Sequence, residues 1–157
     1  MADIDSLKTD VITQFGTPCA VIDLDVVDNN IARVQVLCDA AGRANRPHIK
    51  THKSPQLARR QLDAGAIGIT CQKLGEAEVM FDAGIEDILI ATNIIGAARS
   101  GRLAALQRRV GLKLCADNPV SLAAYAESGR AAENPVRVLI ECDTGQKRAG
   151  VETPGEA

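Results

Sequence analysis

The stretch RPHIKTHKSP, residues 46–55, is predicted to lead from a short strand directly into a helix. The strand is expected to end at Lys50, and Ser54 followed by Pro55 is a typical helix start, with an N-cap residue before a proline at the first helical position. Lys50 is therefore expected at the carboxyl end of a strand, in the loop that leads into the helix.

Lys50 also has basic neighbours in the sequence. His48 and His52 flank it, and Arg46 and Lys53 are close by. Positive charges this near disfavour a protonated amine, and a neutral lysine amine is a nucleophile that forms Schiff bases with the carbonyl of a substrate or of pyridoxal phosphate (PLP). The alternative is a solvated basic turn, or an anion-binding patch at a helix start.

The rest of the chain repeats the strand-then-helix pattern. Continuous apolar runs, typical of strands buried on both faces, predict strands at 19–24, 46–50, 66–70, 87–91, 111–115 and 136–142. Amphipathic segments predict helices at 26–41, 54–64, 74–83, 97–109 and 119–128. Asn118-Pro119 repeats the start signal, and the predicted C-terminal stops are Gly65, Gly84 and Gly129. Strands and helices that alternate at intervals of roughly 20 to 27 residues predict parallel β/α units.

Composition narrows the classes of function. The 157 residues are 46% apolar, and the formal net charge of −2 does not indicate a nucleic-acid or anionic membrane partner. Two Phe, one Tyr and no Trp leave almost no surface on which bases stack. The polar N-terminus is not a signal peptide and no window is apolar enough to span a membrane, so we expect a cytoplasmic protein.

The cysteines give no sign of a metal site or a disulfide framework. They are five in number and none forms a CxxC pair: Cys19, Cys38, Cys71, Cys115 and Cys142. Three of them end apolar runs, which would place them at the mouth of a barrel, but we expect them to be small packing residues without a chemical role.

Four motifs resemble those of one enzyme family. TPCAVIDLD (17–25), RPHIKTHKSP (46–55), GITCQKLGEAEVM (68–80) and DTGQKRAGV (143–151) look like the D-threonine aldolase and eukaryotic-type D-serine dehydratase family, in the same order. These are PLP enzymes of fold type III, similar to alanine racemase in their N-terminal domain. The resemblance covers the chain from about residue 17 to its end.

Two parallel architectures fit the pattern, a doubly wound sheet and an eight-stranded barrel. No GxGxxG motif opens any predicted helix, so the nucleotide-binding form of the first has no support. The resemblance implies the second, an α/β fold with a partial (β/α)8 TIM-type barrel of about six β/α units over residues 17–157, after an extension of residues 1–16. Active residues then belong on loops at the carboxyl ends of the strands.

The resemblance assigns cofactor contacts as well. Lys50 would carry PLP as a Schiff base, and Arg148, in DTGQKRAGV, would lie beside the phenolic oxygen and ring of the cofactor. A guanidinium keeps its charge, so it stabilises a phenolate without competing for its proton. Gln146 is a candidate for the same pocket. Without the resemblance, this segment would be a flexible loop with a solvated arginine.

Three further residues are candidates for the site. Strand alternation puts His48 on the side of Lys50, where it would pack beneath the cofactor or orient the lysine. His52 would hydrogen-bond the cofactor or accept a substrate proton, the alternative being a structural histidine. Asn93, in ATNIIG, is a candidate cofactor contact or a turn-forming residue. The tyrosine that alanine racemases carry further along the lysine loop has no counterpart, which puts a tyrosine-based racemase mechanism in doubt.

The resemblance implies a lyase acting on D-β-hydroxy-α-amino acids. D-threonine aldolase, which yields glycine and acetaldehyde, is our first expectation, and D-serine or D-3-hydroxyaspartate dehydratase and amino-acid racemase are the alternatives. The family also implies a homodimer and a divalent metal, with metal ligands in a C-terminal β domain. No metal ligand is assigned in this chain.

The last residues predict more structure than the sequence contains. Thr153-Pro-Gly-Glu156 is a capping box with proline at the first helical position, and only six strands are predicted where a barrel needs eight. We therefore expect the N-terminal part of a longer protein or the product of a shortened gene, with open edges that favour association. The alternative from another class is a non-catalytic PLP-binding part or an inactive fragment.

Overall fold

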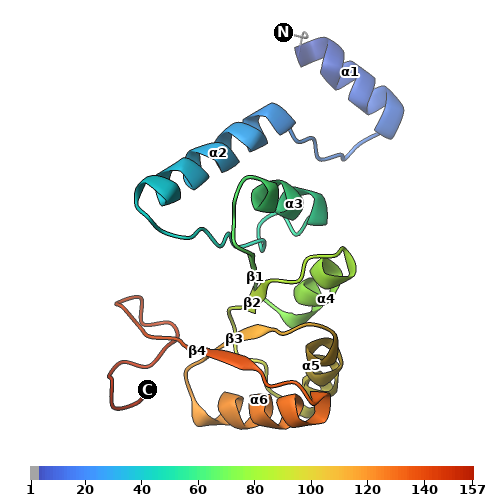
Figure 1. The fold of residues 1–157 in the computed structure, drawn as a ribbon. Helices are drawn as coiled ribbons and strands as arrows, with labels where there is room; N and C mark the ends of the chain where they lie inside the picture. The colour runs from blue at the N-terminus through green and yellow to red at the C-terminus, as the bar shows by residue number, and fades with distance from the viewer. Residues whose placement is uncertain (1–3) are drawn as a thin grey trace. The chain divides into compact units, whose positions relative to one another are not determined.

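The computed structural model describes residues 4–157 (Figure 1). The chain divides into two compact units, one up to Asn30 and one from Ile31 to the end, which are described separately. The first contains α1 (Ile4–Phe15) and the start of α2 (Leu24–Ala40). The second holds the remainder of α2, all the strands and every residue proposed for the site.

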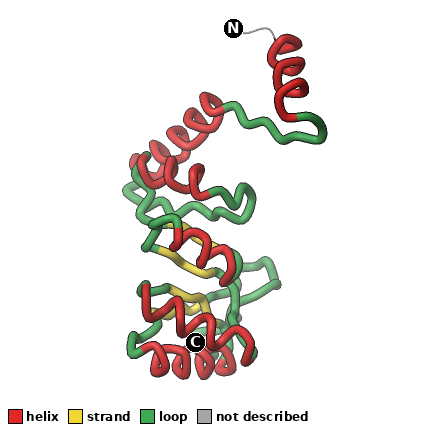
Figure 2. The backbone as a smooth tube through the Cα atoms, turned by 90° about the vertical axis from the view of Figure 1, so that its right-hand side faces the viewer, coloured by secondary structure: helices red, strands yellow, loops and turns green. Residues whose placement is uncertain are grey.

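The second unit is built on a parallel sheet of four strands. These are β1 (Ile69–Cys71), β2 (Ile88–Ile90), β3 (Lys113–Ala116) and β4 (Arg137–Ile140), in the order β1-β2-β3-β4. The helices are α3 (Pro55–Asp63), α4 (Leu74–Asp82), α5 (Ala97–Arg109) and α6 (Pro119–Ala132). Figures 1 and 2 show α4, α5 and α6 gathered on one side of the sheet, which confirms the predicted α/β fold of parallel units.

The core lies between the sheet and these helices. In β3, Leu114 and Ala116 are buried while Lys113 and Cys115 are half-buried, so successive side chains alternate between the helix side and the other face. The largest fully buried side chains come from both layers and include Ile69, Ile88, Ile90, Leu114, Met80, Leu103 and Tyr125. Each is expected to contribute about 1.5–3 kcal/mol of burial free energy.

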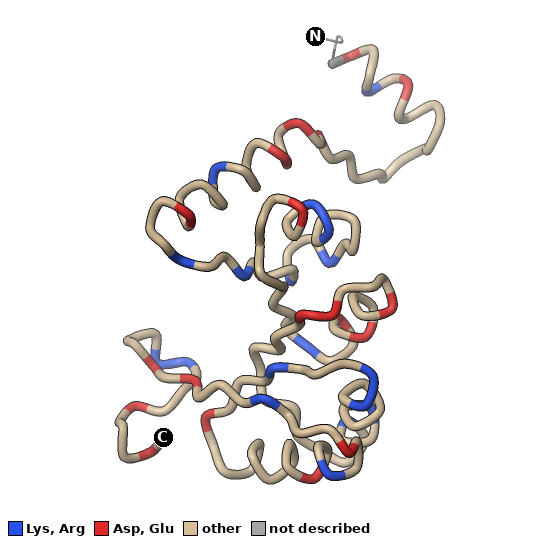
Figure 3. The backbone as a smooth tube through the Cα atoms, in the orientation of Figure 1, with Lys and Arg blue, Asp and Glu red and all other residues tan. Residues whose placement is uncertain are grey.

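Charged side chains on the solvent side of α4 and α5 form ion pairs between the two helices. Figure 3 shows acidic residues on and around α4 and basic residues on α5. Arg102 pairs with Glu78, and Arg109 pairs with Asp82 at 3.1 Å and lies 4.6 Å from the centre of the Phe81 ring. These exposed pairs contribute little stability, so the core carries the fold.

The strand predicted at 19–24 is wrong. Val21 and Ile22 are 63% and 55% exposed, and the chain enters α2 at Leu24 instead. Asp23 starts this helix early, because its carboxylate accepts hydrogen bonds from the backbone N–H groups of Asp25 (3.0 Å) and Val26 (3.2 Å). A strand also needs a neighbour to pair with, and no strand lies in the described part of the first unit.

The strand predicted at 46–50 shrinks to one parallel bridge between His48 and Thr70. The bridge is held by Ile49 N–H to the Thr70 carbonyl (2.9 Å) and Thr70 N–H to the Pro47 carbonyl (2.8 Å). Pro47 has no N–H to extend the ladder, and the chain then turns through Lys53 N–H to the Ile49 carbonyl (2.8 Å). The six predicted units are thus four strands and a bridge among the described residues.

Most helix boundaries agree with the sequence. The Ser54 side chain caps α3 by accepting from Leu57 N–H (3.3 Å), and Asn118 caps α6 by accepting from Ser121 N–H (3.0 Å). Gly65 and Gly84 follow the ends of α3 and α4 with φ of 114° and 81°.

The stop predicted at Gly129 is wrong. α6 continues to Ala132, and Glu133 ends it in the left-handed conformation with φ of 54°. Gly129 instead allows close packing, because a Cβ there would lie 3.3 Å from the Val136 backbone nitrogen.

The chain end forms a turn where a helix is predicted. Glu156 makes half of the predicted capping box, since its carboxylate accepts from the N–H groups of Glu152 (2.7 Å) and Thr153 (3.2 Å).

Within residues 4–157, none of the helices has the length and apolar character needed to cross a membrane.

Candidate functional site

Polar side chains follow the end of each strand. Gln72 comes directly after β1, Thr92 and Asn93 follow β2, Asp117 follows β3 and Asp143 lies just beyond β4. Because the strands are parallel, their carboxyl ends meet at one edge of the sheet. We call this the carboxyl edge, and it includes His48 and Lys50 next to β1.

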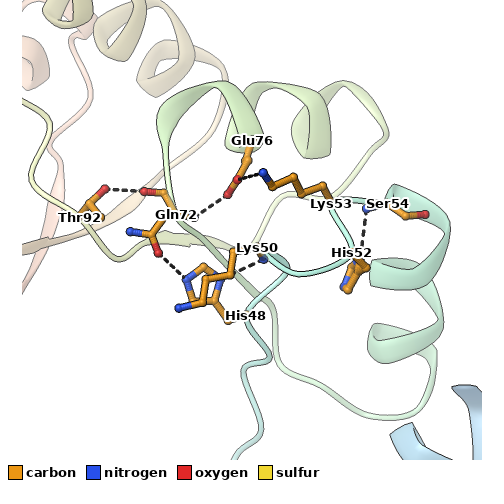
Figure 4. Close-up of polar contacts among 8 residues, drawn as sticks. All are labelled: His48, Lys50, His52, Lys53, Ser54, Gln72, Glu76 and Thr92. Atoms are coloured by element: carbon orange, nitrogen blue, oxygen red, sulfur yellow. Dashed lines mark hydrogen bonds and ion pairs between the residues drawn. The ribbon is translucent and has the colours of Figure 1, made fainter.

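Lys50 presents a free amine at the carboxyl edge. Ile49 is fully buried in the core, whereas Lys50 is exposed. Figure 4 shows the Lys50 side chain beside the His48 ring. Its Nζ makes no hydrogen bond or ion pair with any other residue in the described range 4–157. This amine is therefore open to a ligand.

The structure separates Lys50 from two of its basic neighbours in sequence. Arg46 pairs with Asp87 at 2.5 Å, just before β2 at the opposite edge of the sheet. Lys53 pairs with Glu76 at 3.8 Å, at the start of α4. The crowding of bases expected from the sequence is thus relieved by carboxylates. Among the Lys and Arg side chains of residues 46–53, Lys50 is the one that has no carboxylate partner within the described residues.

His48 contacts Lys50 directly. The Lys50 backbone N–H donates to Nδ1 of His48 at 3.3 Å, and Nε2 lies 3.2 Å from Oε1 of Gln72. Burial lowers the pKa of His48, and nearby Lys50 lowers it too, while the Gln72 hydrogen bond and Glu76 act in the opposite direction. His48 is therefore a neutral ring at pH 7.

His52 points away from this pair in Figure 4. Its Nδ1 accepts a hydrogen bond from Ser54 N–H at 3.0 Å, and its Nε2 lies 3.3 Å from Oε1 of Gln61 in α3. Both ring nitrogens are thus engaged in closing the loop that leads into α3. The structure does not bring His52 to the amine, and its catalytic role stays a prediction.

Asn93 and Asp117 join two strand ends. The Asn93 amide donates to Asp117 Oδ1 at 2.7 Å, and Gly150 N–H donates to Asp117 Oδ2 at 3.0 Å. The bond from Gly150, together with those from Asn118 and Asn93, lowers the pKa of Asp117. Oδ1 of Asn93 is buried and has no hydrogen-bond partner among the described residues. An unpaired buried acceptor is costly, so this oxygen marks a place for a donor.

Arg148 and Gln146 lie on the loop that Gly150 ties to Asp117. The loop closes through a bridge between Cys142 and Val151, and the Asp143 carboxylate accepts from Gly145 N–H at 2.7 Å. Arg148 is exposed and forms no ion pair within the part of the chain that the structure describes. Arg148 and its neighbour Lys147 are thus further cations without a counterion in the described residues, and Gln146 is exposed on the same loop.

Sequence reasoning missed several residues that build the site. Gln72, Glu76, Thr92 and Asp117 all take part in its hydrogen bonds. Gln72, Thr92 and Asp117 lie within two residues of the end of a predicted strand, and that position was the available signal. Their partners lie up to 33 residues away in sequence, which no local pattern reveals. No cluster of three or more potential metal ligands occurs in residues 4–157.

Comparison with known proteins agrees with this geometry. The model of the alanine racemase N-terminal domain matches residues 22–157. The chain is 39% identical to D-threonine aldolase from Arthrobacter sp over 90% of its length and 38% of that protein's. It is 43% identical to D-threo-3-hydroxyaspartate dehydratase from Delftia sp. strain HT23, over 90% of this chain and 37% of that protein.

A solved structure agrees as well. D-threonine aldolase from Filomicrobium marinum superposes with a TM-score of 0.85 at 36% identity, covering 89% of this chain and 38% of that one. The chain therefore spans less than two fifths of the length of these relatives. The residues matched by the family model include the parallel sheet and its carboxyl edge, and the chain belongs to the alanine racemase N-terminal domain family.

Proposed function

We propose that this chain forms the PLP-binding part of a lyase that acts on D-β-hydroxy-α-amino acids. Residues 17–157 would make up this part. Similarity to a D-threonine aldolase and to a D-threo-3-hydroxyaspartate dehydratase supports this substrate class, because both names describe D-amino acids with a hydroxyl on Cβ.

The observation that carries the proposal is the free amine of Lys50 at the carboxyl edge. A primary amine without a counterion is the group that an aldehyde cofactor needs. When bound, PLP supplies an electron-withdrawing ring that weakens a bond to Cα of the amino acid. Arg148 offers an unpaired cation for an anionic oxygen and Asn93 an unpaired buried acceptor for a donor, so the side chains present fit this group.

The chain's own residues then have separate roles. Lys50 holds the cofactor through its amine, the neutral His48 ring lies alongside it, and Arg148 contributes positive charge. Cleavage between Cα and Cβ requires a base that takes the proton of the Cβ hydroxyl. His52 is the proposed base, and it serves only if its ring leaves Ser54 and Gln61.

We favour D-threonine aldolase chemistry, in which D-threonine is divided into glycine and acetaldehyde. The second candidate is dehydration of D-3-hydroxyaspartate to oxaloacetate and ammonia. Identity favours the dehydratase slightly, at 43% against 39%. Both candidates need the same amine, so Lys50 is common to them.

The experiment begins by mixing the purified chain with PLP and recording the absorption spectrum. The wild-type chain should show the band of a PLP–lysine Schiff base, and Lys50→Ala should lack it. Lys53→Ala is the matched control, because Lys53 is three residues away and already paired with Glu76. An equal band in Lys50→Ala would contradict the proposal.

Product analysis then separates the two reactions. The PLP-treated chain is incubated with D-threonine, with D-threo-3-hydroxyaspartate and with L-threonine as a stereochemical control. Acetaldehyde from D-threonine alone supports the aldolase, and oxaloacetate with ammonia supports the dehydratase. Turnover of L-threonine at the same rate would argue against a D-specific site.

A further inference from the structure

His48 is held by two hydrogen bonds that together fix its proton. Nδ1 accepts from the Lys50 backbone N–H at 3.3 Å, so Nδ1 carries no hydrogen of its own. In the neutral ring the proton is therefore on Nε2, from which it is donated to Oε1 of Gln72 at 3.2 Å. The pair of contacts selects one tautomer and one ring orientation beside Lys50.

The backbone of Gln72 is hydrogen-bonded at both its N–H and its carbonyl. Its N–H donates to Oε2 of Glu76 at 2.7 Å, and its carbonyl accepts from Oγ1 of Thr92 at 2.5 Å (Figure 4). Glu76 is only 7% exposed and lies in the first turn of α4, whereas Thr92 follows β2. Gln72 thus joins the Lys50 loop to the ends of two strands and the start of a helix.

The Gln72 side chain is also electrically neutral, which matters next to the amine. The charged groups that face His48 are Lys50 and, more weakly, Glu76. An amide oxygen accepts the Nε2 hydrogen without stabilising an imidazolium as a carboxylate would. A neutral His48 adds no second positive charge beside Lys50, and its unprotonated Nδ1 keeps accepting the Lys50 backbone N–H.

We propose that Gln72 is a positioning residue that holds His48 as the neutral Nε2–H tautomer next to the amine of Lys50. Its importance for catalysis rests on the proposed function, in which Lys50 carries the cofactor. Gln72 does not touch the amine and acts through His48. The first expected consequence of replacing its amide is therefore a change in the protonation of His48.

The test is an NMR titration of the imidazole nitrogens in the 15N-labelled chain without cofactor, with His48 assigned from a His48→Gln variant. In the wild type, His48 should show a protonated Nε2 and an unprotonated Nδ1 at pH 7. In Gln72→Glu, the added carboxylate should raise the titration midpoint of His48 by about one pH unit or more. In Gln72→Met, which keeps the volume but removes the acceptor, the midpoint should fall below that of the wild type.

A matched control is available at the second histidine. Gln61 contacts His52 just as Gln72 contacts His48, so Gln61→Glu adds the same charge to the same kind of pair. It should leave the His48 titration unchanged. Midpoint shifts of opposite sign in the Glu and Met variants are not expected from a merely structural role.

Lys50 provides a second readout that does not need a bound cofactor. Deuterium labelling of the Lys50 backbone amide at pH 7 should be about twofold or more faster in Gln72→Glu than in the wild type, because an imidazolium carries a hydrogen on Nδ1 and no longer accepts from that N–H. Labelling of Lys53 should stay the same.

Three results would overturn the proposal. The first, which is measured on the wild type alone, is a His48 ring with its proton on Nδ1. The second is a His48 titration midpoint that is unchanged in Gln72→Glu, and the third is a midpoint that is unchanged in Gln72→Met. These outcomes concern His48 alone. If Lys50 fails to bind PLP while His48 behaves as described, the proposed function is wrong and the role of Gln72 stands.

Discussion

The two edges of the sheet carry the same kinds of basic side chain in opposite states. At the amino edge, where the parallel strands begin, Arg46 and Lys113 both contact Asp87, at 2.5 and 2.6 Å. At the carboxyl edge, Lys50 and Arg148 have no counterion among the described residues. Arg46 and Lys50 are only four positions apart in the sequence. Charge composition therefore does not distinguish Arg46 from Lys50, whereas their pairing does.

The electrostatics of Asp87 illustrate the paired state. Burial opposes its ionisation, but the hydrogen bonds from Arg46 and Lys113 outweigh burial and lower its pKa. At the carboxyl edge, by contrast, the acceptor atom Oδ1 of Asn93 is buried and has no hydrogen-bond partner in residues 4–157. One edge is closed by its own charges, and the other is left open to a ligand.

The largest effect on the amino edge is expected from Gly68→Ala. A Cβ at Gly68 would lie 2.6 Å from the Asp87 carbonyl oxygen and would also overlap the Arg46 guanidinium. The backbone must shift, so we expect a loss of about 2–3 kcal/mol in the free energy of unfolding, measured by urea denaturation. Gly101→Ala is the control, because nothing lies within 4 Å and it is inside α5.

Gly101→Ala should stabilise the chain by roughly 0.5–1 kcal/mol, as alanine does in a helix interior. If the two variants were equally stable, the close packing assigned to the amino edge would be wrong.

The next effect is expected at the carboxyl edge from Asp117→Asn. The Gly150 N–H loses a carboxylate acceptor, which contributes about 1.5 kcal/mol, so hydrogen exchange at the Gly150 amide should accelerate about tenfold. The Val151 amide donates to the Glu141 carbonyl and should keep its rate. Unchanged exchange at Gly150 would mean that Asp117 does not anchor the Arg148 loop.

Asp87→Asn should cost about 1 kcal/mol at neutral pH, since it removes the acceptor of a two-cation network. The folded pKa of Asp87 lies below its unfolded value, so this contribution is complete above the unfolded pKa. It is lost as pH falls through the folded pKa, and urea titrations of both proteins should converge in acid.

The control for this variant is Asp82→Asn. Within residues 4–157, Asp82 pairs with Arg109 alone, and both side chains are more than half exposed. The loss should be under about 0.5 kcal/mol, and a loss equal to that of Asp87→Asn would remove the distinction between a network and a surface pair.

The smallest effect on stability is expected from Arg148→Met. Arg148 has no ion pair in the described chain, so the free energy of unfolding should change by less than about 0.5 kcal/mol. Arg46→Met, which leaves Asp87 with one partner fewer, should cost more. Calorimetry of the two variants compares an unpaired arginine with a paired one, and the reverse order would contradict the comparison of the edges.

The sequence predicts much of the fold because local signals suffice for it. Continuous apolar runs locate the four strands, and Ser54 and Asn118 mark two helix starts by side-chain hydrogen bonds within three residues. Local signals fail where a distant partner decides. The run at 19–24 has the composition of a strand but no neighbouring strand in its unit, and Gly129 serves packing against Val136 rather than a helix end.

The site divides in the same way. The position of Lys50 at a strand end follows from its own stretch of sequence, but its lack of a counterion does not. Arg46 and Lys53 are neighbours of Lys50 in the sequence, but in the structure Arg46 pairs with Asp87 and Lys53 pairs with Glu76. Gln72 is likewise invisible in the sequence, because its partner His48 is 24 residues earlier.

The central claim is that Lys50 is the reactive base of this chain. The most direct measurement is to treat the purified chain with PLP, reduce it with borohydride and map the modified lysine by mass spectrometry. We predict pyridoxyl modification mainly at Lys50, little at Lys53 and Lys113, which are paired, and none of this pattern in Lys50→Ala. Labelling that is spread over the exposed lysines and persists in Lys50→Ala would contradict the claim.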